Sequence, residues 1–102
     1  MLPTPRSTSE EVEREAARVV SRLGTLSPTK VPADVVAAAA QRLADLARAA
    51  EGLSPTPVPD LRPHGWASLL RVLVTDLLAA PATEDQLVAA RDELTALRRV
   101  LP

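Results

Sequence analysis

The residues best suited to chemistry lie in one short segment, from Asp60 to Trp66. His64, the only histidine, follows Asp60 and Arg62 and precedes Trp66, the only tryptophan. A histidine near a carboxylate and an arginine is typical of an acid–base centre, or of an anion pocket at the start of a helix. A Pro-His-Gly-Trp stretch is also an ordinary way to anchor a loop through a buried tryptophan. We favour this structural interpretation.

The rest of the chain offers little further chemistry. One histidine and no cysteine cannot make a zinc site, so we expect neither a metal nor a cofactor. Ser68 follows one turn after His64, but the sequence around it does not resemble a nucleophile elbow, and no glycine-rich phosphate loop is present. We therefore predict that the protein is not an enzyme.

Composition indicates a single domain with a thin core. The 102 residues are 46% hydrophobic, much of it alanine, and the net charge is −1. This charge argues against a protein that lives on nucleic acid or on anionic lipid. No export signal and no bilayer-length apolar segment stand out, which predicts a cytoplasmic protein with no membrane partner. The preference for arginine over lysine suggests a bacterial, GC-rich genome.

Apolar spacing and prolines predict an all-α fold, a four-helix bundle with Pro-rich linkers. The helices are expected at about 10–23, 32–50, 63–80 and 84–101. Residues 1–9 are expected to form a flexible segment, and residues 10–102 a single helical-bundle domain.

Capping signals support these boundaries. Ser7 or Thr8 is expected to cap the first helix, and Gly24 and Gly52 to end the first two helices. A capping box from Thr83 to Gln86 begins the fourth helix.

The third helix is apolar nearly all round, which predicts the centre of the bundle or an oligomer interface. Its main stripe is expected to be buried together with two leucines of the fourth helix: Trp66, Leu69, Leu70, Leu73, Leu77, Leu94 and Leu97. Val72, Val74 and Leu78 lie off that stripe. The short connection Pro81–Thr83 predicts that the third and fourth helices are antiparallel neighbours. On the second helix, Gln41, Asp45 and Arg48 are expected to face water.

Two similar linkers separate the first three helices. Leu26–Pro32 reads Leu-Ser-Pro-Thr-Lys-Val-Pro, and Leu53–Pro59 reads Leu-Ser-Pro-Thr-Pro-Val-Pro. Both are expected to be stiff and extended, so that either could turn the chain back or carry it along the bundle. They could also fold over the apolar third helix and cover it.

These features favour a non-catalytic helical protein–protein interaction module or small adaptor. We expect it to bind a protein partner or itself, as a symmetric homodimer through the third or fourth helix. The candidate partner-binding residues are Arg62, His64, Trp66, Val74 and Leu78.

The alternative is a DNA-binding regulator or accessory protein. Residues 46–54 resemble the first helix and turn of a helix-turn-helix. Pro55, Pro57 and Pro59 occupy the positions of the recognition helix, which cannot form through them. Arg91, Arg98 and Arg99 could instead touch a phosphate backbone, although arginines on a solvated helix face are more common.

Overall fold

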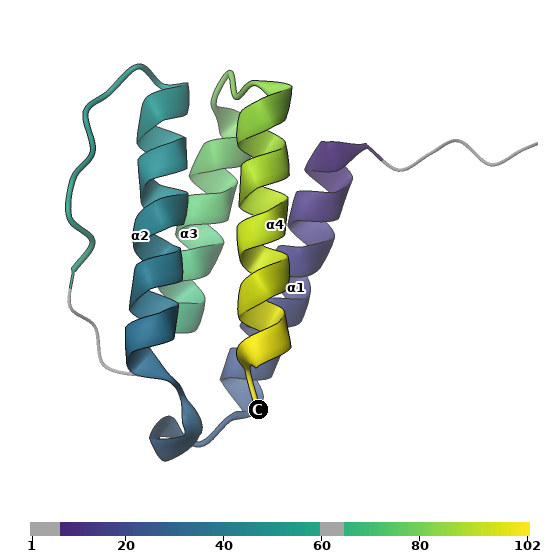
Figure 1. Ribbon diagram of the computed structural model, residues 1–102, viewed down its shortest axis with the longest axis vertical. Coiled ribbons are helices and arrows are strands. Elements are labelled where there is room, and N and C mark those ends of the chain that lie inside the picture. The colour runs from purple at the N-terminus through teal and green to yellow at the C-terminus, as the bar shows by residue number, and fades with distance from the viewer. Residues whose placement is uncertain (1–6, 60–64) are drawn as a thin grey trace, which may run out of the picture.

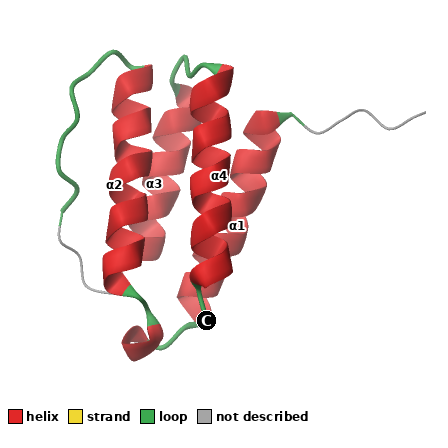
Figure 2. Ribbon diagram, viewed as in Figure 1, coloured by secondary structure: helices red, strands yellow, loops and turns green. Residues whose placement is uncertain are grey.

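The structure is a computed structural model that describes residues 7–59 and 65–102. Four α-helices follow in order: α1 (Thr8–Thr25), α2 (Ala33–Ala50), α3 (Trp66–Ala79) and α4 (Glu84–Val100). A short 3-10 helix, η1 (Pro28–Lys30), lies between α1 and α2. The described part of the chain contains no strand (Figure 2), which confirms the predicted all-α four-helix bundle.

The first helix is longer at both ends than its sequence pattern predicts. Ser7 caps it by accepting a hydrogen bond from the backbone N–H of Glu10 at 3.2 Å. Thr8 and Ser9, assigned above to a flexible segment, therefore belong to α1. The prediction that Gly24 ends the helix is wrong, because α1 continues through Gly24 to Thr25. One glycine only weakens a helix, and helical hydrogen bonds on both sides carry it through.

Gly52 does end α2. Its φ of 73° lies in the left-handed region, where a residue without a Cβ has no steric penalty. The N–H of Gly52 donates to the carbonyl of Ala49, and the N–H of Leu53 donates to that of Arg48. These two hydrogen bonds form a Schellman motif, which satisfies carbonyls that the helix leaves without partners. At the other end of α2, Pro32 occupies the cap, one residue before its expected position.

The start of α4 follows the prediction. The Thr83 hydroxyl accepts from the N–H of Gln86 at 3.1 Å, and the Gln86 side chain accepts from the N–H of Thr83 at 2.9 Å. This reciprocal pair is the capping box, and Glu84 and Asp85 add favourable negative charge to the first turn. The helix ends one residue earlier than expected, at Val100.

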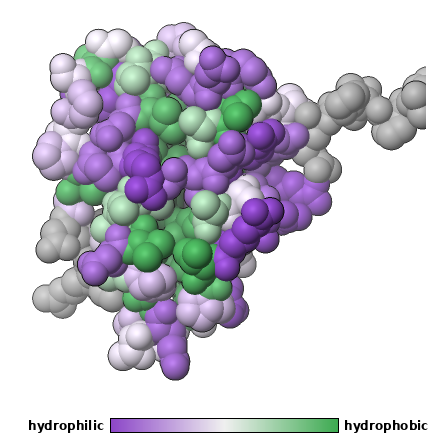
Figure 3. All heavy atoms as spheres, in the orientation of Figure 1, coloured by the Kyte–Doolittle hydropathy of each residue, from purple (hydrophilic) through white to green (hydrophobic). Residues whose placement is uncertain are grey.

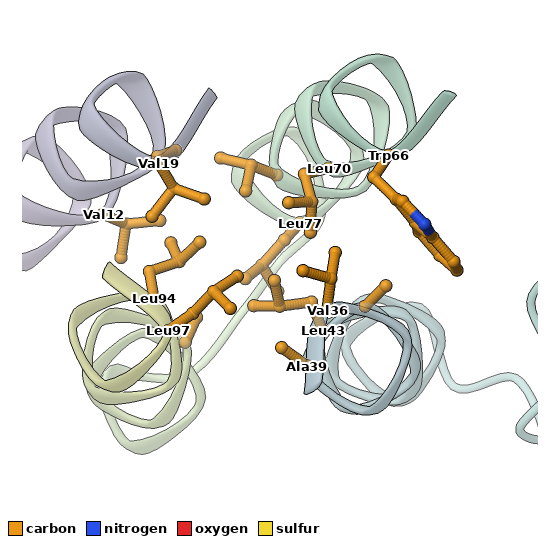
Figure 4. Packing of buried hydrophobic residues seen from close by; sticks show 14 of the residues in the cluster. Val12, Val19, Val36, Ala39, Leu43, Trp66, Leu70, Leu77, Leu94 and Leu97 are labelled. Atoms are coloured by element: carbon orange, nitrogen blue, oxygen red, sulfur yellow. The ribbon is translucent and has the colours of Figure 1, made fainter. Parts of the chain in front are cut away.

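The helices pack around a square in which chain neighbours are not always neighbours in space. The packed pairs are α1 with α4, α4 with α2, α2 with α3, and α3 with α1. Figure 1 shows that α1 and α4 run in one direction, while α2 and α3 run in the other. Figure 4, which looks along the bundle, shows α3 and α4 at opposite corners.

The prediction that α3 and α4 are antiparallel is therefore confirmed, but the prediction that they are neighbours is wrong. The diagonal of a square of helices about 8–10 Å apart is only about 11–14 Å. The five peptide steps from Ala79 to Glu84 can reach up to about 17 Å. A short loop can thus cross the bundle end as easily as it can join adjacent corners.

The long connection from α2 to α3 follows from the direction of these two helices. They are parallel neighbours, so the chain must return along the length of the bundle before α3 begins (Figure 1). The prolines of residues 53–59 suit this return, because they favour an extended chain and cannot continue a helix.

The core lies where the four helices meet and consists of alanine, valine and leucine with one tryptophan. Its buried residues are Val12, Ala16, Val19, Leu23, Val36, Ala39, Ala40, Leu43, Ala44, Ala47, Trp66, Leu70, Val74, Leu77, Ala90, Leu94 and Leu97. Five of the seven side chains predicted to be buried are among them. Leu69 and Leu73 are only half-buried, because they border an open groove between α2 and the connection from α2 to α3.

Hydropathy adds one observation about membranes. Among the helices that the structure describes, none combines the length and the apolar character that crossing a bilayer requires.

Gly24 and Gly52 allow a matched test of these helix ends. A Cβ added at Gly24 would meet no atom within 4 Å, and its backbone is helical, so Gly24→Ala should stabilise the protein by about 0.5–1 kcal/mol. Gly52→Ala should destabilise it by about 1–2 kcal/mol, because alanine is strained at positive φ. Urea unfolding of both variants checks the signs. A loss of stability in Gly24→Ala would mean that Gly24 is a helix cap after all.

Candidate interaction surfaces

The structure does not bring the five residues of the predicted binding site together on one surface. Arg62 and His64 lie outside the described residues. Trp66 is 2% exposed and Val74 is 5% exposed, so the protein's own chain already covers both side chains. Leu78 is half-buried.

Trp66 occupies the start of α3 and packs between α3 and α2 (Figure 4). It fills space that the small alanines of α2 leave, since a tryptophan contributes far more contact area than any other residue in this core. Its indole Nε1 has no hydrogen-bond partner among the described residues. The role found for Trp66 is thus that of a core anchor, in agreement with the structural interpretation of the Pro-His-Gly-Trp stretch.

Val74 and Leu78 lie along the seam between α3 and α1. They line a small groove of about 210 Å³ together with Ala16, Ala17 and Val20 of α1. From the sequence, we expected Val74 to lie on a surface that a second copy of the chain would cover. This expectation is wrong for Val74, because α1 covers its side chain. Of the three residues that lie off the main stripe of α3, only Val72 is strongly exposed, at 54%.

The connection from α2 to α3 runs along α2 and flanks another side of α3, and polar residues of α2 hold it there. The Gln41 side chain accepts from the N–H of Val58 at 2.9 Å and donates to the carbonyl of Thr56 at 3.0 Å. The Arg48 guanidinium donates to the carbonyl of Ser54 at 2.7 Å. Sequence reasoning missed this role, since it placed Gln41 and Arg48 in water. The spacing of polar residues along α2 could not reveal this role, because a polar residue has the same place in the sequence pattern whether its side chain contacts water or a loop.

Asp45 belongs to the same arrangement. Its carboxylate accepts a hydrogen bond from the Gln41 amide at 2.9 Å. This contact orients the amide so that its oxygen remains available for Val58. With Pro57, Val58 and Pro59 held against the bundle, Leu69 and Leu73 border a groove of about 300 Å³ instead of open solvent. The linker therefore flanks α3 along this groove, without closing over it.

The seam between α1 and α4 is closed by ion pairs. Arg91 contacts Glu11 at 2.7 Å, and Arg98 contacts Glu15 at 2.7 Å. The hydrogen bond to Glu11, helped by the neighbouring Asp92, raises the pKa of Arg91 above its ordinary value. Both arginines thus serve contacts within the chain, whereas the DNA-binding alternative needed them free for phosphate.

Within the part of the chain that the structure describes, no other helix packs over the surface shared by α2 and α4, which we call the α2/α4 face. On α2 it comprises Val35, Ala38, Arg42, Leu46 and Ala49, spaced three or four residues apart. On α4 it comprises Ala89, Glu93, Ala96 and Val100, at the same spacing. Val35 is 44% exposed and Val100 is 56% exposed. Figure 3 views the molecule from this side and shows apolar residues gathered in its lower half, below a polar band.

One ion pair crosses the α2/α4 face near its middle, between Arg42 and Glu93. Beyond this pair, toward the end of α2, Leu46, Ala49 and Ala89 border a shallow hollow of about 460 Å³ with Pro55. The face therefore has a charged centre between two apolar ends.

A second exposed surface, the α1 arginine row, consists of Arg14, Arg18 and Arg22. The three residues are four apart, so their side chains project from the same side of α1 at a rise of about 6 Å each. They border a wide, open hollow of about 590 Å³ with Ser21 and Thr25. Part of this charge is engaged within the chain, because Arg18 contacts Glu15 at 3.3 Å.

Because Val74 is buried, its substitution should affect the stability of the fold. A carboxylate there would be buried against the alanines and Val20 of α1, so Val74→Glu should destabilise the fold itself by several kcal/mol at any protein concentration. Val72→Glu, two residues away on the exposed side of α3, should change stability by less than about 0.5 kcal/mol. Urea unfolding of the two variants compares them. Equal stability would show that α1 does not cover Val74.

Within the described ranges, no three histidine, cysteine or carboxylate side chains gather in a way that could hold a metal ion. Comparison of the chain with models of protein families, with curated proteins and with solved structures gives no match.

Proposed function

We propose that this protein is a non-catalytic interaction module that binds another protein through its α2/α4 face. The observation that carries the proposal is the exposure of Val35 and Val100 at one end of this face, over which no other described helix packs. On α3, which was the surface expected to bind a partner, α1 covers Val74 and the linker flanks Leu69 and Leu73, so that Val72 is the one large apolar side chain of this helix that is strongly exposed.

The composition of the face supports a protein partner over a small molecule. The hollow beside Leu46 and Ala89 is shallow and open, whereas small ligands favour concave sites that enclose most of their surface. Small and apolar residues along two helices instead suit another helical surface, because alanine lets helices approach closely. An apolar surface bordered by polar residues is also a common mark of a protein contact.

Site-specific photo-crosslinking in the producing organism tests this function. A photoreactive phenylalanine derivative at position 35 or at position 96, both on the α2/α4 face, should form a covalent adduct. Both positions should capture one and the same partner protein. The same group at position 72, where the native valine is similarly exposed on α3, should not. The adduct at position 96 should disappear when Val100→Glu is added. Adducts that form equally at position 72, or none at positions 35 and 96, would contradict the proposal.

A second candidate function, binding of a nucleic acid, is favoured by the α1 arginine row alone. Once Arg18 leaves Glu15 and Arg22 leaves the carbonyl of Pro102, the three arginines can neutralise three phosphates, which predicts a slope of about −2.7 for log affinity against log salt concentration. Fluorescence anisotropy with a labelled DNA duplex measures this slope. Arg14→Ala should reduce its magnitude by about 0.9, while Arg42→Ala, on the α2/α4 face, should leave it unchanged. Absence of binding at low salt would exclude this candidate.

A further inference from the structure

The charges on the α2/α4 face indicate which partner it fits. We propose that the face binds a second copy of this chain, about a two-fold axis that runs parallel to the helices. This proposal rests on the proposed function, because it names the partner of the same surface.

The face has the same pattern on both of its helices. α2 and α4 are antiparallel neighbours, and Arg42 and Glu93 fix their register. Val35 and Val100 each lie seven residues from that pair, so they are level at one end of the face. Leu46 and Ala89 each lie four residues from it, on the other side. Both helices thus present apolar, charged and apolar positions at matching heights.

A two-fold axis along the helices makes this pattern complementary to itself. Such an axis places α2 against the partner's α4 without exchanging the two ends of the bundle. Arg42 then faces the partner's Glu93, and Val35 faces the partner's Val100. A two-fold axis across the helices would instead place Arg42 against the partner's Arg42. Like charges in contact are unfavourable, so electrostatics selects the first arrangement.

The size of the face sets the strength of the contact. A helix of eighteen residues is about 27 Å long, and two helices side by side are about 20 Å wide. Their common face therefore offers on the order of 500 Å² from each copy, near the lower limit of specific interfaces. We expect a reversible dimer that forms at micromolar or higher concentrations. The alanines at positions 38 and 96 allow the two helix pairs to approach closely.

Charge reversal at the central pair tests the arrangement. Sedimentation of the native chain should give a mass that rises with concentration from 10.8 kDa toward twice that value. Arg42→Glu should abolish this rise, and so should Glu93→Arg, because each places like charges across the contact. Val72→Glu, on α3, should leave it unchanged. Circular dichroism confirms that each variant is folded.

An equimolar mixture of Arg42→Glu and Glu93→Arg is the decisive measurement. Within each variant the residues at positions 42 and 93 still repel each other, whereas between the two variants every facing pair becomes attractive. The mixture should therefore recover the dimer. Recovery supports the proposed pairing, since no contact within one chain is restored by mixing.

The proposal is overturned if the native chain stays at 10.8 kDa up to about 1 mM, far above the micromolar range in which contacts of this size form. It is also overturned if dimerisation survives both reversals, or if the mixture does not recover it. The crosslinking experiment separates these failures from failure of the proposed function. An adduct with a different protein at positions 35 and 96 would leave the function standing and remove the self-partner.

Discussion

A helix with leucine or valine on most of its circumference must be covered on several sides, and α3 is that helix. Full burial of each such side chain is worth about 1.5–3 kcal/mol relative to exposure. One neighbouring helix covers about one face, so α3 packs against α1 and against α2. The linker flanks a third side, where Leu69 and Leu73 remain half-buried beside a groove. The positions of α1, α2 and the linker all follow from this need.

Packing of α3 between α1 and α2 also decides where α4 lies. With two corners of the square next to α3 already occupied, the only remaining corner is opposite α3, between α1 and α2. There α4 closes the core with Ala90, Leu94 and Leu97. Its two sides then meet different neighbours: arginines pair with glutamates of α1 on one side, and Glu93 pairs with Arg42 of α2 on the other.

The alanine content of α2 has opposite effects on its two sides. Toward the core, Ala39, Ala40 and Ala47 let neighbouring helices approach, and Trp66 packs between α2 and α3 at the start of α3. Toward solvent, Ala38 and Ala49 leave the α2/α4 face shallow, with the larger Val35 and Leu46 standing above it. A single compositional bias thus produces both a thin core and a surface suited to another helix pair.

Much of the fold is local enough to be predicted from the sequence. Proline positions, apolar spacing and capping residues predicted four helices, whose ends lie within about three residues of those observed. The Thr83 capping box and the Gly52 helix end are also as expected. Of the candidate binding site, however, little was predictable. Spacing along a helix shows which side chains share a face, but it does not show which element covers that face. From the sequence, Val74 was therefore expected at the surface, and Gln41 was expected to face water.

The two similar linkers show most clearly what the sequence determines and what the tertiary structure decides. Ser27-Pro28-Thr29 and Ser54-Pro55-Thr56 have the same residues, and each follows a helix that has ended and keeps an α-helix from resuming at once, because proline lacks an N–H and fixes its φ. The first leads into the 3-10 helix η1, while the second is extended along α2, with hydrogen bonds from Arg48 and Gln41. The sequence by itself determined that the helices stop at these points. Tertiary structure decided the path between them, because only packed helices place Gln41 and the open side of α3 within reach of the chain.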